Sequence, residues 1–386
     1  MKILWINNIS DTEIWRTTQL ELTGALRRKG HNVILVMAKK IGGKQSKDEN
    51  IIYIPTTSTY LSSGLLFGLI VFCYFPIFIW KKKPDVIIID ENSVWLPFAL
   101  TFKLFNIPII IDIRSLPIKE KYLISFDIPL YLSKYMIDGL TTITPELEEI
   151  LRKKYNLKDK KIGIWPSGVS TEMFIRSDKD ENIDYKTDPN KFVIIHHGSH
   201  GGLRGIENLI KSIGELDKSL RKKTDLLLVG VPKAKMIEYS ELCKKIGVTE
   251  QVKIFSKVEY KKIPSFIKSA NVGIIPLDPN HEWWKVSVPL KTLEYLGMGK
   301  PIIATSIPFH QRLFKKGECG ILIDSDSPKA LSDAINFMYQ NREKLDEMGR
   351  IGKEIVKSCY TWDCIACDVE KFLKDILVDK SNETVT

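Results

Sequence analysis

The feature that most constrains the fold is an alternation of short, β-branched apolar runs with longer segments of helical period. The runs are almost continuously hydrophobic, as expected for parallel strands that helices cover on both faces. In the first half they begin at residues 3, 33, 51, 86, 109 and 141, and in the second half at residues 192, 226, 252, 272, 301 and 320. The pattern predicts an α/β protein with two Rossmann-like, doubly wound domains facing a cleft.

The length also favours two domains, since 386 residues exceed one ordinary core. The stretch from Gly168 to Lys191 is polar and lacks an apolar period, which is typical of a linker. We therefore predict a first domain over residues 1–168, a second over 169–360, and a terminal segment over 361–386.

Composition excludes several classes of protein. With 44% hydrophobic and 27% charged residues, the chain has the composition of a soluble globular protein. The formal charge of +10 suits nucleic acid, an anionic membrane or an acidic substrate such as a nucleotide diphosphate. Basic residues are spread over many helix faces without an RNA-binding or zinc-finger signature, so no nucleic-acid partner is expected. The six cysteines are too sparse for a disulfide framework, and Cys364 and Cys367 form only half a zinc motif, which predicts ordinary thiols in a reducing cytosol.

Residues 61–80 contain no charged side chain, are long enough to span a bilayer, and precede Lys81-Lys-Lys83. A single crossing would separate strands that belong to one sheet, so we expect a helix that packs on the core or lies at a membrane interface. The basic end favours anionic lipid. The expected location is cytoplasmic, with peripheral contact of 61–83 with the inner face of the cell membrane as the alternative. The N-terminus predicts a first strand and shows no secretory signal.

A glycine-rich loop, His197 to Gly205, directly follows one predicted strand and precedes a helix. Glycines let the backbone approach a ligand, helix N-termini attract anions, and Arg204 adds donors suited to phosphate. A tight turn with a surface arginine is the alternative. His196, His197 and His200 cluster here without a neighbouring carboxylate, so we predict polar lining of a ligand site and no metal.

A second segment, from Ser287 to Thr305, predicts a loop, a helix and a strand. Pro289 suits the first turn of the helix, whose free N–H groups would face a phosphate beside Lys291. Glu294 lies one turn further on, where its carboxylate could accept hydrogen bonds from the two hydroxyls of a ribose. The alternative is a solvated pair of Lys291 and Glu294.

These motifs, taken in order over nearly the whole chain, resemble the GT-B retaining glycosyltransferases of family four, also called glycosyl transferases group 1. The stretch Gly198-Ser199…Arg204-Gly205 is similar to a Gly-Arg…Lys-Gly loop of that family. Glu294, followed by Gly299-Lys-Pro-Ile-Ile, resembles the second of two family glutamates. Residues 165–174 and 83–88 are further weak matches. The tail around Trp362 resembles a helix that crosses back onto the first domain, here within 361–386.

The resemblance implies a role for each matched residue. Glu294 would hold the ribose, Arg204 and Lys291 the diphosphate, and backbone groups near Val258 the base. The candidate catalytic residues are Arg204, Lys291, Glu294 and Arg114. The candidate donor-binding residues are Gly198, Ser199, Gly202, Val258, Val288, Pro289 and Leu290. Further candidate contacts to donor or acceptor are Asp112, Ser115, His197, His281 and Glu282.

Two positions depart from the family pattern. Val286 stands where the family has its first glutamate, which meets the donor sugar, and Ser199 stands where it has a loop arginine. His281 and Glu282 could replace the glutamate if the loop is offset.

The resemblance implies a hexosyltransferase of polysaccharide biosynthesis. It would move a sugar from a nucleotide-diphosphate sugar to a glycan or lipid-linked acceptor, with retention of configuration and without metal or cofactor. The departing phosphate would accept the proton of the acceptor. Two alternatives stay open: a nucleotide-sugar epimerase of the same fold, and an inactive nucleotide-binding subunit of a glycan-assembly complex.

Overall fold

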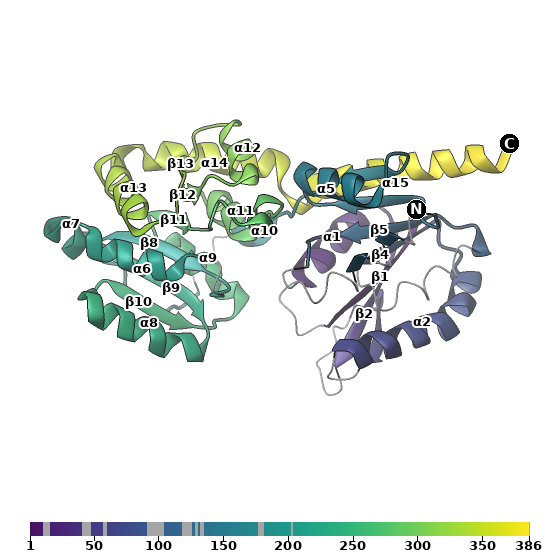
Figure 1. The fold of residues 1–386 in the computed structure, drawn as a ribbon, viewed down its shortest axis with the longest axis horizontal. Coiled ribbons are helices and arrows are strands. Elements are labelled where there is room, and N and C mark those ends of the chain that lie inside the picture. Colours follow the sequence, from purple (N-terminus) through teal and green to yellow (C-terminus); the bar gives the residue numbers. More distant parts are fainter. Residues whose placement is uncertain are drawn as a thin grey trace. The chain divides into compact units, whose positions relative to one another are not determined.

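A computed structural model of the chain describes residues 1–10, 16–40, 48–56, 60–90, 104–117, 126–127, 130–131, 135–176, 181–201 and 204–385. The chain forms two compact units (Figure 1). Unit 1 comprises Met1–Ser167 and Trp362–Thr386, and unit 2 comprises Gly168–Thr361. Each division lies one residue from a predicted domain boundary.

Unit 1 contains a seven-stranded parallel sheet in the order β3-β2-β1-β4-β5-β6-β7. The strands are β1 Lys2–Ser10, β2 Asn32–Lys40, β3 Ile51–Thr56, β4 Val86–Asp90, β5 Ile109–Ile113, β6 Gly139–Thr142 and β7 Lys161–Ile164. The order reverses at β1 and β4, which is the arrangement of a doubly wound fold. The first six strands confirm the predicted runs, whereas β7 was not predicted.

The helices of unit 1 include α1 Arg16–Arg28, α2 Tyr60–Lys82, α5 Pro145–Tyr155 and α15 Trp362–Val385. The sequence favours the start of α5, since the Thr144 hydroxyl accepts a hydrogen bond from the Leu147 N–H and Pro145 opens the helix. Helix α15 buries Trp362, Ile365 and Val369 in the same apolar cluster as residues of β1. The last helix is therefore part of the unit 1 core.

Two glycines of unit 1 make room for α15. A Cβ on Gly163 would lie 2.7 Å from the Phe372 ring, and one on Gly139 would lie 3.1 Å from it. The strand β7 was missed because Gly163 interrupts a four-residue run whose side chains are exposed or half-buried, so its apolar signal is weak.

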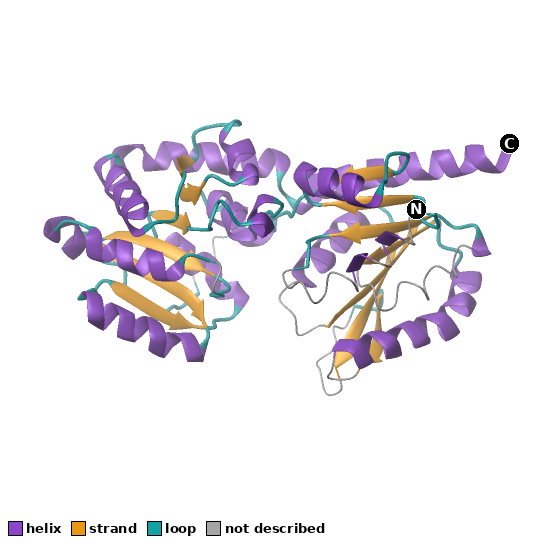
Figure 2. Cartoon of the chain, in the orientation of Figure 1, coloured by secondary structure: helices purple, strands orange, loops and turns teal. Residues whose placement is uncertain are grey.

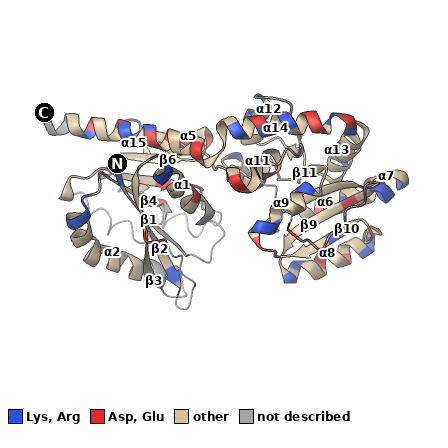
Figure 3. Cartoon of the chain, turned by 180° about the vertical axis from the view of Figure 1, so that it is seen from behind, with Lys and Arg blue, Asp and Glu red and all other residues tan. Residues whose placement is uncertain are grey.

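Helix α2 packs against β3 and buries Phe67, Val71 and Ile79. Its opposite face exposes large apolar side chains, and its described part carries no charge before the basic end (Figure 3). Among the described residues, no helix combines the length and apolarity needed to cross a membrane.

Unit 2 contains a six-stranded parallel sheet in the order β10-β9-β8-β11-β12-β13, with helices on both faces (Figure 2). The strands are β8 Phe192–His197, β9 Thr224–Val231, β10 Val252–Ser256, β11 Val272–Ile275, β12 Ile302–Thr305 and β13 Gly320–Ile323. The helices are α6 Ile206–Glu215, α7 Lys218–Lys223, α8 Lys233–Ile246, α9 Ile263–Lys268, α10 Glu282–Lys285, α11 Leu290–Gly297, α12 Pro308–Phe314, α13 Pro328–Gln340 and α14 Leu345–Cys359. The predicted fold class, α/β with two Rossmann-like parallel sheets, is confirmed.

The stretch predicted as a linker belongs to unit 2. Phe174 lies in a short π-helix, Thr171–Ile175, and is 1% exposed. Tyr185 is buried and donates a hydrogen bond of 3.1 Å to the Asp225 carboxylate. The linker prediction was wrong because two isolated aromatic residues among polar ones anchor this stretch without producing an apolar period.

Candidate functional site

The candidate site lies where the strand order of unit 2 reverses, at the carboxyl ends of β8 and β11. Open α/β sheets bind ligands at such switch points. His196 and His197 end β8, the glycine-rich loop follows, and α11 supplies Lys291 and Glu294. The chain thus brings the two predicted motifs together, because β8 and β11 are neighbours in the sheet.

The loop depends on its glycines. Gly198 and Gly205 have φ values of 100° and 64°, which residues with a Cβ rarely adopt. A Cβ on Gly205 would lie 2.0 Å from the Pro276 carbonyl oxygen, and one on Gly198 would lie 3.8 Å from the Lys291 Nζ. Ser199 is exposed, and Gly202 lies outside the described residues. The backbone at Gly198 therefore lies close to the Lys291 ammonium.

Lys291 is buried, and its Nζ donates a hydrogen bond of 2.9 Å to His196 Nε2. His196 Nδ1 lies 3.0 Å from the Ile274 carbonyl oxygen, so the ring donates there and accepts from Lys291. Burial, with the nearby Arg204 charge, moves the pKa of Lys291 well below its usual range. Burial and Lys291 lower the pKa of His196 in the same way. An anion bound beside Lys291 would favour its charged form and raise its pKa toward the usual value.

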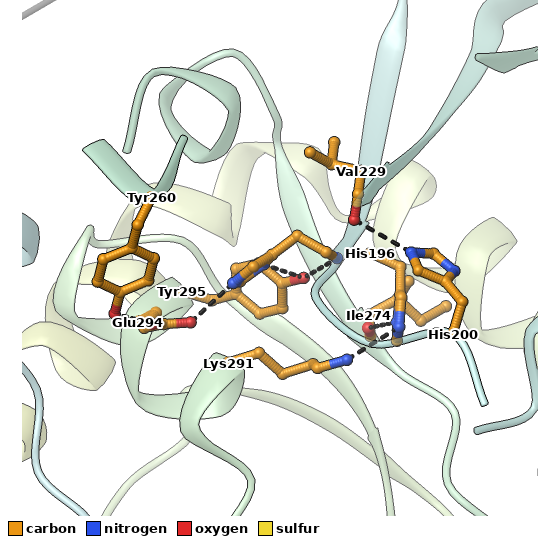
Figure 4. Close-up of polar contacts among 9 residues, drawn as sticks. His196, His200, Val229, Tyr260, Ile274, Lys291, Glu294 and Tyr295 are labelled. Atoms are coloured by element: carbon orange, nitrogen blue, oxygen red, sulfur yellow. Dashed lines mark hydrogen bonds and ion pairs between the residues drawn. The ribbon is translucent and has the colours of Figure 1, made fainter. Parts of the chain in front are cut away.

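Glu294 is also buried and has partners on both carboxylate oxygens (Figure 4). Its Oε2 lies 2.7 Å from His197 Nε2, and its Oε1 accepts a hydrogen bond of 2.6 Å from the Tyr260 hydroxyl. Burial raises the pKa of Glu294, but His197, Tyr260 and Lys291 lower it more, so the net pKa lies below the usual value. The solvated Lys291–Glu294 pair is thus wrong, because each side chain is buried on partners from other elements.

Tyr295 holds His197 in place. Its hydroxyl accepts a hydrogen bond of 3.0 Å from the His197 backbone N–H and lies 2.9 Å from His197 Nδ1. These contacts are satisfied together when the hydroxyl donates to Nδ1 and His197 Nε2 donates to Glu294. A Cβ on Gly273 would lie 2.2 Å from the Tyr295 ring, so a glycine in β11 is needed for this arrangement.

Arg204 lies over aromatic rings. Its Cζ is 5.0 Å from the centroid of Trp284 and 6.0 Å from that of Trp283. Burial lowers the pKa of Arg204 to about 10. No carboxylate of the described residues lies within ion-pair distance of Arg204 or Lys291. The site therefore holds two cations that form no ion pair with a carboxylate, as a site for an anionic ligand requires.

The residues near the missing family glutamate have local roles. Val286 is 1% exposed and belongs to the core. Glu282 is exposed and pairs with Lys285 at 2.6 Å. His281 Nδ1 accepts a hydrogen bond from the Trp283 N–H and caps α10. The structure thus gives His281 and Glu282 partners next to them in sequence rather than Glu294 or Lys291.

Helix α11 begins at Leu290, so Pro289 is its capping residue and not its first helical residue. Val288 is buried, and Pro289 and Leu290 are half-buried at the same helix end. Val258 is half-buried in the segment between β10 and a 3₁₀ turn, Tyr260–Lys262.

The remaining candidates lie in unit 1, at the end of β5. Asp112 is buried and accepts a hydrogen bond of 2.7 Å from the Thr141 hydroxyl. Burial raises its pKa to about 6, although Arg114 and Thr141 oppose the shift. Arg114 stacks 3.7 Å from the Trp165 ring centroid and donates to the Trp165 carbonyl and the Ser167 hydroxyl. Ser115 is half-buried beside it.

Four aromatic residues of the site were not predicted, namely Tyr260, Trp283, Trp284 and Tyr295. A signal existed for Tyr295, since Gly273 interrupts an otherwise β-branched strand and implies a bulky neighbour. The pair Trp283-Trp284 also lies only two residues before the predicted loop. No sequence signal connects Tyr260 with Glu294, which is 34 residues away.

Comparisons with known proteins agree for both halves of the chain. Residues 177–355 match the family described as Glycosyl transferases group 1. Residues 17–173 match the family described as Glycosyltransferase Family 4.

The curated relatives share only part of their length with the chain. A D-inositol 3-phosphate glycosyltransferase of Paenarthrobacter aurescens is 26% identical over 223 residues, which cover 56% of this chain and 53% of the relative. An uncharacterized glycosyltransferase of Methanocaldococcus jannaschii is 24% identical over 229 residues, covering 58% and 55%. The chain therefore spans about half the length of the curated relatives it matches.

Solved structures resemble the chain over nearly its whole length. Sucrose-phosphate synthase from Thermosynechococcus elongatus has a TM-score of 0.76 at 16% identity and covers 98% of this chain and 100% of its own. HepE of Anabaena, in complex with UDP, has a TM-score of 0.73 at 12% identity, covering 97% and 100%. At such identities the likeness concerns the fold. Taken with the family matches and the switch-point site of unit 2, it means that the chain belongs to the group 1 glycosyltransferases of GT-B fold.

Proposed function

We propose that the protein transfers a hexose from a nucleotide-diphosphate sugar to a glycan or lipid-linked acceptor, with retention of configuration, in polysaccharide assembly. The observation that carries the proposal is a pair of cations beside a glycine-rich loop, the half-buried Arg204 and the buried Lys291, neither of which is paired with a carboxylate. Similar proteins support the donor class. HepE is described in complex with UDP-glucose, and a Mycobacterium tuberculosis relative is named a GDP-mannose-dependent mannosyltransferase.

In the proposed reaction, the acceptor hydroxyl oxygen bonds to the anomeric carbon on the face from which the diphosphate departs. The bond from the anomeric carbon to the phosphate oxygen breaks, and that oxygen takes the acceptor's proton. Negative charge grows on the diphosphate as it leaves. Arg204, Lys291 and the N–H groups at the start of α11 would stabilise it without a metal, and Asp112, Arg114 and Ser115 would meet the sugar and acceptor.

A thermal-shift panel of UDP, GDP, ADP and their sugar conjugates tests donor binding. A ligand stabilises the form that binds it, so one nucleotide class should raise the melting temperature selectively. Arg204→Ala should lower turnover about a hundredfold, or ~3 kcal/mol of barrier. Arg350→Ala is the matched control, because Arg350 is exposed and pairs with Glu347.

Other outcomes separate the alternatives. Unchanged turnover in Arg204→Ala would contradict the assignment of the site. Conversion of the donor sugar without acceptor would identify an epimerase. A thermal shift without donor breakdown for any acceptor would identify an inactive binding subunit, as Val286 and Ser199 would allow.

We also propose that residues 61–83 contact the anionic inner face of the cell membrane from the cytoplasmic side. Leu69, Phe72, Ile77 and Trp80 recur at helical spacing on one face of α2 and are 44% to 68% exposed. Lys81, Lys82 and Lys83 follow and are exposed. Apolar side chains with a tryptophan and a basic end suit the interface of an anionic bilayer.

Flotation with phosphatidylglycerol-containing vesicles tests this contact. Ile77→Asp should abolish co-flotation, whereas Ile237→Asp, which changes an exposed isoleucine of α8 in unit 2, should not. Equal flotation of both variants would contradict the proposal. Concentration-dependent dimerisation that Ile77→Asp removes would assign the face to a second copy instead.

A further inference from the structure

We infer that Tyr260 is a specificity-determining latch, whose hydroxyl occupies the place of a ribose hydroxyl on Glu294 until a donor nucleotide displaces it. The inference rests on the proposed function, because it takes Glu294 as the ribose carboxylate. It concerns how strongly the site distinguishes ribose from deoxyribose.

Neither oxygen of Glu294 is without a donor. Oε2 lies 2.7 Å from His197 Nε2, and Oε1 lies 2.6 Å from the Tyr260 hydroxyl. The Glu294 residue is only 5% exposed, so little of its surface is open to a new donor. Each oxygen could accept a second hydrogen bond, but the enclosed carboxylate leaves little room for a further donor. We therefore expect a ribose that donates to it to compete with His197 or with Tyr260.

His197 cannot give way easily. It is 4% exposed, and Tyr295 contacts both its backbone N–H and its Nδ1. Tyr295 in turn fills the space left by Gly273 in β11. Moving His197 would break its three hydrogen bonds, two with Tyr295 and one with Glu294, at the carboxyl end of β8.

Tyr260 is far more exposed to solvent than His197. It is 43% exposed and belongs to a three-residue 3₁₀ turn, Tyr260–Lys262. Its ring meets the buried Phe174 edge-on, with centroids 5.7 Å apart. The hydroxyl can leave Glu294 by rotation of an exposed side chain, and water can then satisfy it.

The hydrogen bond between the Tyr260 hydroxyl and Glu294 also stabilises the site when no donor nucleotide is bound. A buried carboxylate oxygen without a donor costs free energy, and the Tyr260 hydroxyl removes that cost. Donor binding then exchanges one hydrogen bond for another. The ribose hydroxyl adds less affinity than it would at an unoccupied carboxylate.

The test is isothermal titration of the full chain with UDP, GDP and ADP and with their 2′-deoxy counterparts. In Tyr260→Phe the nucleotide that binds should bind roughly threefold to tenfold more tightly. The affinity of its 2′-deoxy form should change less. The dissociation constant of the 2′-deoxy form divided by that of the ribonucleotide should therefore rise. Phenylalanine keeps the ring contact with Phe174, and a thermal melt confirms folding.

Tyr339→Phe is the matched control, because its ring packs on Phe192 in the same unit and it shares no contact with Glu294. An unchanged or smaller ratio in Tyr260→Phe, or weaker binding of the ribonucleotide, would overturn the latch. Glu294→Gln separates the two proposals. If it leaves the wild-type ratio intact, the ribose role of Glu294 fails, and the latch fails with it.

Discussion

The two units have the same kind of parallel sheet, yet the ionisable side chains near the carboxyl ends of their central strands differ. In unit 1, Asp90 accepts a hydrogen bond from Trp5, and Asp112 accepts one from Thr141. In unit 2, Lys291 and Arg204 lie at this edge with one carboxylate, Glu294, which contacts His197. The sheet architecture therefore does not decide which ligand is bound. The few charged side chains at its switch point do, and those of unit 2 favour a diphosphate.

The largest expected effect separates the two edges by ligand binding. Lys291→Met keeps the alkyl stem and removes the ammonium, so UDP or GDP affinity and turnover should fall about a hundredfold. Folding stability should hold or rise, since an unpaired buried charge is lost. Arg114→Met in unit 1 should leave nucleotide affinity unchanged. Calorimetric titration measures the nucleotide affinity of both variants. Equal losses of affinity in Lys291→Met and Arg114→Met would contradict the difference between the two units.

The next effect concerns the packing behind each edge. Gly273→Ala would place a Cβ 2.2 Å from the Tyr295 ring, and we expect a loss of about 3 kcal/mol in the free energy of unfolding. Gly163→Ala would meet Phe372 at 2.7 Å on an edge strand, which can adjust, so a smaller loss is expected. Urea unfolding compares the two. A larger loss in Gly163→Ala would contradict this ranking.

The carboxylates of the two units should respond to pH in opposite ways. Burial raises the pKa of Asp112 to about 6, above the ~3.9 of an unfolded aspartate. Its contribution is therefore favourable at low pH and is lost as the pH rises from about 4 to about 6. Asp112→Asn should stabilise the protein by about 2 kcal/mol at pH 8 and by little at pH 3.5.

The pKa of Glu294 is lowered, so its contribution is present above the unfolded value and is lost on acidification. Glu294→Gln should accordingly destabilise the protein at pH 8 and much less in acid. Unfolding curves across the pH range test both variants. If the stability of the two variants, relative to the unsubstituted protein, changed with pH in the same direction, the proposed difference between Asp112 and Glu294 would be wrong.

The smallest effect uses one helix cap in each unit. The Thr144 hydroxyl caps α5 in unit 1, and the Ser327 hydroxyl caps α13 in unit 2. Alanine at either position should cost about 1 kcal/mol. Hydrogen exchange should quicken in α5 for Thr144→Ala and in α13 for Ser327→Ala. Quickening in both helices from one substitution would show that the units do not unfold separately.

The sequence predicted the strands well because most of them are buried on both faces, which leaves continuous apolar runs such as Leu226 to Val229. It failed where burial depends on single residues, as for Phe174 and Tyr185, or where a strand is short and half-buried, as for β7. The sequence also predicted which residue types form the site, because they occur in two recognisable motifs. The contacts between these residues could not be predicted, because Lys291 meets His196 across 95 residues and Glu294 meets Tyr260 across 34.

The place of α15 has a consequence for the order of folding. Unit 2 is one continuous stretch of chain, whereas unit 1 needs Trp362, Ile365 and Val369 from the last helix to fill its core. A ribosome that builds the chain from its N-terminus delivers all of unit 2 before this helix emerges. Unit 1 is therefore synthesised first but completes its core last. Until α15 emerges, the apolar surface that this helix covers is accessible to chaperones.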